Sequence, residues 1–223
     1  VTCQTDFFEQ IAKIRALRRI WAQMMKEEFG AKEPRSLKLT ITVHTSGLSL
    51  TPRQLPNNIA RGTLQALASA FAGVQATEVS TFDEPYRIPS LKADMVSLRS
   101  QQVIAYESGI AKVIDPFGGS YFMESLTNEI EGRIRDYVKK IEDMGDPAKL
   151  SEEGAFKAIF ENATLRYHKE VAEGERKIVG ENILVIPDED DTLLRDVAEE
   201  KFEPATQQIQ KIKELIRTRD NSR

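Results

Sequence analysis

Polar residues that could bind a ligand or move a proton follow a β-branched run near the start of the chain. The run Thr40–Val43 favours a strand, and the polar stretch His44–Gly47 follows it directly. An imidazole among hydroxyl groups can hydrogen-bond a ligand or transfer a proton near neutral pH. The stretches Gln75–Asp83 and Val113–Tyr121 have the same pattern. Because parallel strands place their carboxyl ends at one edge of a sheet, we predict that the three strand ends share one site.

Two adjacent carboxylates, Asp83 and Glu84, follow the second of these runs. Neighbouring side chains in an extended segment point to opposite sides, so the two do not form a general acid–base pair by themselves. We expect one of them to cap the turn at Pro85 while the other faces a site. The third run leads from Asp115 into the Gly118–Ser120 loop, which matches neither the dinucleotide-binding nor the P-loop fingerprint.

Other groups point to structure rather than chemistry. His168 lies in the polar stretch Arg166–Lys169 and is predicted to be structural or solvated. The single cysteine, Cys3, excludes an intramolecular disulfide framework and a cysteine-based zinc site, and its position predicts a spectator thiol near a frayed terminus. The acidic run Pro187–Asp191 lacks the spacing of a calcium loop and predicts a solvated turn. We therefore assign no catalytic residue and no metal ligand.

The composition indicates a folded protein without a nucleic-acid or membrane partner. Of its 223 residues, 40% are hydrophobic and 30% are charged, which is typical of globular chains. The net charge of −4 gives no indication of nucleic-acid binding. No apolar run reaches the roughly 18–20 residues that a membrane span needs. No cationic and apolar leader begins the chain, so we expect a cytoplasmic location.

The spacing of apolar residues and of glycine and proline predicts alternating helices and strands. Asp6 is the expected N-cap of the first helix. The predicted helices are Phe7–Phe29, Ile59–Ala72, Ala93–Glu107 and Leu126–Met144, and the predicted strands are Ser36–Val43, Gln75–Thr81 and Lys112–Asp115. Such alternation favours a parallel α/β sheet with right-handed crossovers. Three strands are too few for a closed barrel, which needs eight.

The alternation stops after Gly145, and we divide the chain there into residues 1–150 and a following region, residues 151–223. In the second region we predict a helix at Glu152–Glu173, a short extended segment at Lys177–Ile186 and a polar helix at Thr206–Arg219.

Five segments, in the same order, closely resemble the cobalamin-dependent acyl-CoA mutases, and the nearest well-known member is the large (alpha) subunit of methylmalonyl-CoA mutase. They are FFEQIAKIRALRRIWAQMMKEEFGAK, HTSGLSLTPRQLPNNIARGTLQALA, STFDEPYRIP, QQVIAYESGIAKVIDPFGGSYFMESLTNEIE and IEDMG. The resemblance is strong from Phe7 to about Gly145 and looser over Glu152–Val185.

This resemblance implies that residues 1–150 form the C-terminal part of a TIM (β/α)8 barrel, followed by a helical and extended appendage. In the family, adenosylcobalamin lies over the carboxyl-terminal face of the barrel, and acyl-CoA threads through it. The cofactor starts a radical rearrangement of the carbon skeleton, and the protein positions it. The matching motifs imply that the cofactor-binding residues are His44, Thr45, Gly47, Ser80, Glu84 and Pro85.

The chain departs from the family pattern at the positions that would face the cofactor. The family's Gln-Thr-Ser-Gly reads His44–Gly47 here, and its His-Thr-Asn reads Glu78–Ser80. Phe-Asp-Glu is retained, with its Glu at Glu84, but Pro85 replaces the usual Ala.

Motifs that would complete the chemistry are absent from this sequence. The family loop that carries the active-site His, the residues that hold the substrate carboxylate, and the Asp-x-His-x-x-Gly motif that ligates cobalt do not occur. We therefore expect an N-terminal barrel polypeptide and a cobalamin-binding domain as partners, with the cobalt ligand supplied by another chain or domain. Two alternatives are a non-catalytic half-barrel that self-associates as a homodimer and a piece of a longer mutase.

Overall fold

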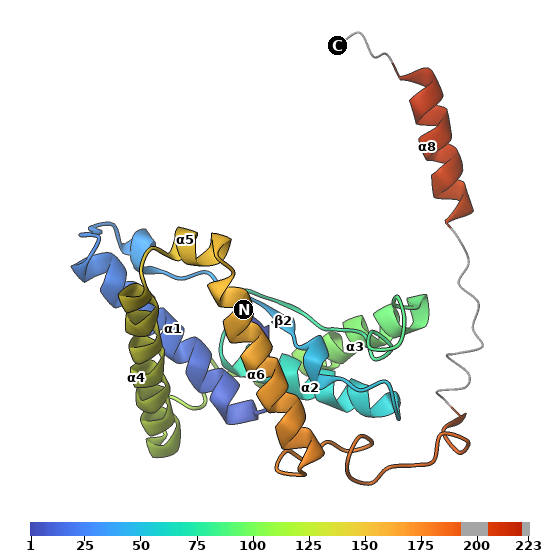
Figure 1. Cartoon of the computed structure of the whole chain (residues 1–223), viewed down its shortest axis with the longest axis horizontal. Helices are drawn as coiled ribbons and strands as arrows, with labels where there is room; N and C mark the ends of the chain where they lie inside the picture. The colour runs from blue at the N-terminus through green and yellow to red at the C-terminus, as the bar shows by residue number, and fades with distance from the viewer. Residues whose placement is uncertain (193–204, 220–223) are drawn as a thin grey trace.

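A computed structural model describes residues 1–192 and 205–219 of the chain (Figure 1). The first long helix, α1 (Phe7–Glu27), begins as predicted, because the Asp6 side chain accepts a hydrogen bond from the Glu9 backbone N–H at 3.3 Å. The other helices are α2 (Pro56–Phe71), α3 (Leu91–Glu107), α4 (Tyr121–Met144), α5 (Pro147–Glu152), α6 (Ala155–Ala172) and α8 (Thr206–Thr218), with 3-10 turns at Pro34–Leu37, Gly47–Ser49 and Ile110–Lys112.

Three short strands form a parallel sheet in the order β1 (Thr2–Cys3), β2 (Thr42–Thr45) and β3 (Ala76–Glu78). The predicted α/β class, with about three parallel strands and flanking helices, is therefore confirmed. A closed barrel is not formed by the described residues.

The identity of the strands differs from the sequence prediction. Strand β2 begins later than predicted, because Pro34–Leu37 forms a 3-10 turn, and β3 is shorter than predicted. Strand β2 also ends later than predicted, so His44 and Thr45 lie in the strand and not in the loop after it. The predicted third strand is wrong: Ile110–Lys112 forms a 3-10 turn, and Val113 begins an irregular loop. The third strand is instead β1. It was not predicted, because two residues are too few to show the alternation of apolar and polar residues that indicates a strand.

Cys3 belongs to the core, and the prediction of a frayed terminus is wrong. Its side chain is completely buried, and β2 binds the segment through the His44 N–H to Val1 O (3.0 Å) and the Ser46 N–H to Cys3 O (2.8 Å). Burial raises the pKa of the Cys3 thiol. The thiol is therefore part of the packed interior.

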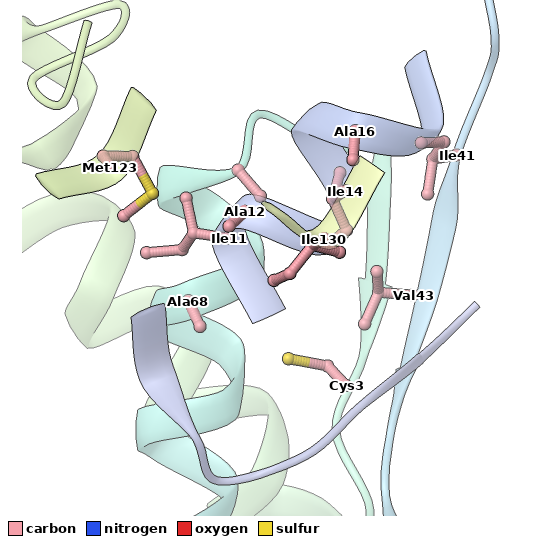
Figure 2. Packing of buried hydrophobic residues seen from close by; sticks show 11 residues of the cluster. Cys3, Ile11, Ala12, Ile14, Ala16, Ile41, Val43, Ala68, Met123 and Ile130 are labelled. Carbon is pink, nitrogen blue, oxygen red and sulfur yellow. The ribbon is translucent and has the colours of Figure 1, made fainter. Parts of the chain in front are cut away.

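The core lies between the sheet and helices α1, α2 and α4. Helix α1 contributes Ile11 and Ile14, α4 contributes Met123 and Ile130, and β2 contributes Val43 (Figure 2). Small residues of α2 allow close packing, as predicted, since a Cβ added at Gly62 would lie 3.1 Å from Val79 Cγ1. Helices α1 and α4 lie side by side (Figure 1).

The loop that was predicted to follow a third strand is bound to helix α1 instead. Arg15 donates to Asp115 Oδ2 and to Glu124 Oε1, both at 2.6 Å. Val113 and Ile114 line a groove of about 490 Å³ together with the Val74–Thr77 segment, at the start of β3. This loop therefore lies beside the amino-terminal end of β3, away from its carboxyl-terminal end.

The region after Gly145 is helical but not as predicted in detail. The predicted helix Glu152–Glu173 corresponds to α6, which begins at Ala155, and the short helix α5 before it was not predicted. The predicted extended segment contains only an isolated bridge between Val179 and Ile183. The acidic run does form a turn, in which the Asp190 N–H donates to Pro187 O. Residues 193–204 and 220–223 of the predicted 151–223 region lie outside the described residues.

Candidate functional site

The carboxyl ends of β2 and β3 are joined through Thr45. The Ser80 backbone N–H donates to Thr45 Oγ1 at 2.8 Å, and the Ser80 hydroxyl donates to the Thr45 carbonyl oxygen at 3.0 Å. Both residues are buried. Two of the residues that the sequence selected, 35 positions apart, thus form one junction.

His44 is attached to the same junction. Its Nδ1 lies 2.7 Å from the Thr45 carbonyl oxygen, which accepts but cannot donate, so the proton of a hydrogen bond there belongs to Nδ1. Its Nε2 lies 3.8 Å from Glu78 Oε1. The imidazole side chain remains 51% exposed, so a ligand at this edge can reach it.

Gly47 and Glu84 bring the two loops beyond the strands into contact. A Cβ atom added at Gly47 would lie 2.7 Å from Glu84 Oε1. Glu84 is exposed, and within the described residues no hydrogen bond or ion pair engages its carboxylate. Pro85 follows and is half-buried. The exposed Glu84 carboxylate thus lies beside the backbone of Gly47, which carries no side chain.

Asp83 and Glu84 take different roles, as predicted, although they lie in a turn rather than in an extended segment. Asp83 is 1% exposed, and its Oδ2 accepts from the Ser90 N–H at 3.0 Å. Its backbone carbonyl accepts from the N–H groups of Tyr86 and Arg87 and closes the turn. Asp83 therefore holds the loop, and Glu84 faces outward.

Asn58 is a further positioning residue that the sequence reasoning did not identify. Its amide accepts from the Thr51 N–H (3.1 Å) and donates to the carbonyl oxygens of Thr51 (2.7 Å) and Phe82 (2.9 Å). Arg61 donates to its Oδ1 at 2.6 Å. Because it is 1% exposed and touches the loops after both strands, Asn58 fixes their relative position. The only available signal was a polar residue in the first turn of an otherwise Ala- and Leu-rich helix.

The prediction that three strand ends share one site is wrong for the third. Asp115 and the Gly118–Ser120 loop lie with α1 and α4, since Gly119 N–H donates to Glu124 Oε1. His168, as predicted, is exposed on α6. Among residues 1–192 and 205–219, no group of three or more His, Cys, Asp or Glu side chains could hold a metal ion.

No helix in the described part of the chain is both long enough and apolar enough to cross a membrane. The cytoplasmic location remains a prediction.

Comparison with known proteins gives a consistent result. A family model described as methylmalonyl-CoA mutase matches residues 1–223. The 2-hydroxyisobutanoyl-CoA mutase large subunit of Aquincola tertiaricarbonis is 41% identical over 187 residues, which cover 84% of this chain and 33% of that protein.

Two methylmalonyl-CoA mutases match nearly all of the chain. The human mitochondrial protein is 36% identical over 217 residues, covering 97% of this chain and 29% of its own length. The protein of Escherichia coli (strain K12) is 34% identical over 217 residues, covering 97% of this chain and 30% of its own length. The chain thus spans about a third of the length of these relatives. On these matches, the chain belongs to the methylmalonyl-CoA mutase family.

Proposed function

We propose that this chain supplies the cofactor-facing edge of an adenosylcobalamin-dependent acyl-CoA mutase. The observation that carries the proposal is the junction at the carboxyl ends of β2 and β3, where Thr45 binds Ser80 and Glu84 lies against Gly47. Carboxyl ends of parallel strands are where barrel enzymes bind their ligands. Family membership supports the mutase reaction.

The residues present fit a corrin cofactor. The corrin ring carries amide side chains, which need hydrogen-bond acceptors and donors, and the exposed Glu84 carboxylate is an acceptor without a protein partner among the described residues. His44 offers a half-exposed imidazole. The missing side chain of Gly47 lets the Glu84 carboxylate lie against the backbone of the loop after β2. The two hydrogen bonds between Thr45 and Ser80 hold the ends of β2 and β3 together, and Pro85 restricts the backbone after Glu84.

Adenosylcobalamin supplies, when bound, the organic radical that starts the rearrangement of the acyl-CoA substrate. The contribution of this chain is binding and orientation: Glu84 and His44 hold the edge of the ring, and Asn58 and Asp83 keep the two loops in place. We assign no proton transfer to these residues. An N-terminal barrel polypeptide, the acyl-CoA site and the cobalt ligand are expected from other chains or segments.

The test is to combine this chain with an N-terminal barrel polypeptide and a cobalamin-binding domain of the family and to titrate the assembly with adenosylcobalamin. Glu84→Gln is expected to weaken cofactor binding about tenfold, because a charge-assisted hydrogen bond is lost. Glu107→Gln, an exposed carboxylate at the end of α3, is the matched control and should bind as the unmodified chain does. Failure to assemble and to isomerise acyl-CoA, or equal affinities for both variants, would contradict the proposal.

One observation favours a second candidate, a non-catalytic half-barrel that pairs with another copy of itself. Ile114 is 100% exposed beside the apolar groove at the start of β3, and β1 and β3 each pair on one side only within the described sheet. Burial of such edges against a second copy would stabilise a homodimer. Sedimentation of the purified chain decides between the two: a stable dimer that does not bind cobalamin supports self-association, and a chain that assembles only with mutase partners excludes it.

A further inference from the structure

His44 and Glu78 are direct neighbours across the parallel strands β2 and β3. The strand register pairs His44 with Glu78, and it pairs Thr2 of β1 with His44. In β2, Val43 and Thr45 are buried while Thr42 and His44 are exposed, so His44 points away from the core of α1, α2 and α4. His44 and Glu78 therefore lie on the open face of the sheet, at its carboxyl-terminal edge.

Both nitrogens of the His44 ring are directed toward protein oxygen atoms. Nδ1 is held at 2.7 Å by the Thr45 carbonyl, and Nε2 faces Glu78 Oε1 at 3.8 Å. The Thr45 carbonyl can fix one end of the ring, but rotation about the remaining bonds is limited only if the other end also has a partner. Glu78 is that partner, and it comes from the neighbouring strand. Because its carboxylate only accepts, Glu78 binds Nε2 in the form of the ring that carries a proton on both nitrogens.

Two of the positions at which the chain departs from the family pattern described above are His44 and Glu78. Where that pattern has Gln and His, this chain has His44 and Glu78. The two departures are a single adjacent pair in the sheet.

We propose that Glu78 is a positioning residue for His44, and that the pair presents the imidazole to the cofactor bound at this edge. The inference rests on the proposed function, since it deepens the assignment of the same site. The pair contributes little to folding, because both side chains are largely exposed at 51% and 78%. The role of the pair is to orient the His44 imidazole toward the cofactor.

The first test uses the ring nitrogens, because the chain contains only two histidines. Ring ¹⁵N spectra of the full chain are recorded with His168→Gln to assign His44. The spectra are recorded at about pH 5.5, between the ordinary pKa values of an imidazole and a carboxyl group, so that the ring can donate from Nδ1 to the Thr45 carbonyl and from Nε2 to Glu78. Glu78→Ala should change the His44 Nε2 signal, because that N–H loses its acceptor, and should leave the Nδ1 signal and His168 unchanged. Glu78→Gln, which keeps a hydrogen-bonding group of the same length, should retain most of the original signal.

Two controls show that the change is local. The midpoint of thermal unfolding of Glu78→Ala should equal that of the unmodified chain, and Glu107→Ala should leave the His44 ring signals in place. Unchanged His44 signals in Glu78→Ala, or equal changes at His44 and His168, would overturn the positioning role.

The second test measures adenosylcobalamin affinity in the assembled mutase. Glu78→Ala should weaken binding several-fold, up to about tenfold, as expected for one misplaced hydrogen-bonding group. The double variant His44→Gln, Glu78→His, which restores the family pair, should recover the affinity. If Glu84→Gln has no effect on affinity while Glu78→Ala still alters the His44 ring, the proposed function fails and the positioning role stands. If Glu84→Gln weakens binding and Glu78→Ala changes neither ring nor affinity, the positioning role fails alone.

Discussion

Glu84 lies so close to Gly47 that a Cβ atom added at Gly47 would be 2.7 Å from the Glu84 carboxylate oxygen Oε1. The atom that would be displaced is the far end of an exposed, flexible side chain rather than backbone. The Glu84 carboxylate can therefore occupy this place only because residue 47 has no side chain.

The first prediction concerns Gly47→Ala. The substitution should change the free energy of unfolding by less than about 1 kcal/mol, because the Glu84 side chain can move away. It should weaken adenosylcobalamin binding in the assembled mutase, because the carboxylate is displaced. Gly132→Ala is the control, since no atom lies within 4 Å of a Cβ added at that position in α4. It should stabilise the chain by about 0.5–1 kcal/mol without affecting the cofactor. Strong unfolding by Gly47→Ala would contradict this account.

The second prediction concerns the buried hydroxyl of Thr45. Thr45→Val keeps the shape of the side chain but leaves the Ser80 N–H without its acceptor, so it should destabilise the chain by about 1–3 kcal/mol. Thr45→Ser keeps the oxygen and should cost less. Urea denaturation followed by circular dichroism measures both variants. Equal losses would show that packing of the methyl group, rather than the hydrogen bond, holds the strand ends together.

The third prediction compares two neighbouring amides at the start of α2. Asn58→Ala removes contacts to Thr51, Phe82 and Arg61 in a buried position and should cost about 2–4 kcal/mol. Asn57→Ala removes only a contact to Gln54 at a half-buried position and should cost less than about 1 kcal/mol. Both are measured by the same denaturation experiment. A similar cost for the two variants would argue against Asn58 as the link between the loops.

The fourth prediction concerns the thiol of Cys3. Burial raises its pKa above the ordinary value, so the folded state holds the thiol proton more tightly than the unfolded state does. The stability contributed by this group is fully present below the ordinary thiol pKa of about 8.5 and is lost as the pH rises through the raised value.

Two measurements test whether the chain loses stability as the pH rises. Denaturation at increasing pH should show a loss of stability above about pH 8.5 that is smaller in Cys3→Ala when each is compared with its own value at pH 7. Alkylation of the native chain should be slow and should become fast on unfolding. Rapid alkylation under native conditions would show that β1 is detached from the sheet.

The helices could be predicted because their signals are local. The Asp6 cap, the apolar spacing in α1 and the glycines at helix ends are read within a few residues, and for α1, α2, α3 and α4 the structure differs only at the boundaries. The short helix α5 was missed. The polar stretches at the ends of β2 and β3 were also visible, because a β-branched run that turns into hydroxyl groups is a local pattern. The division of Asp83 and Glu84 into an inward and an outward carboxylate was also predicted, although the two residues lie in a turn and not in the extended segment that the prediction assumed.

The strands were predicted less well, because a strand forms only when its backbone is hydrogen-bonded to a neighbouring strand. Val113 and Ile114 have high strand propensity, yet Ile114 is fully exposed and the segment is held by the Arg15–Asp115 ion pair. Cys3 has no such local pattern around it, yet it pairs with Thr45 and enters the core. Backbone pairing with β2 places Cys3 in a strand, and Val113 and Ile114, which have no such pairing, form a loop.

The sequence by itself determined the helix positions, the family and the residue types at the strand ends. Only the tertiary structure decided which strand ends meet, and it brought together Thr45 with Ser80, Gly47 with Glu84, and His44 with Glu78. The physical reason is that helix signals repeat within one turn of the chain, whereas the register between parallel strands joins residues separated by a whole helix. No local pattern records that register, and the hydrogen bonds that form once the strands are side by side determine it.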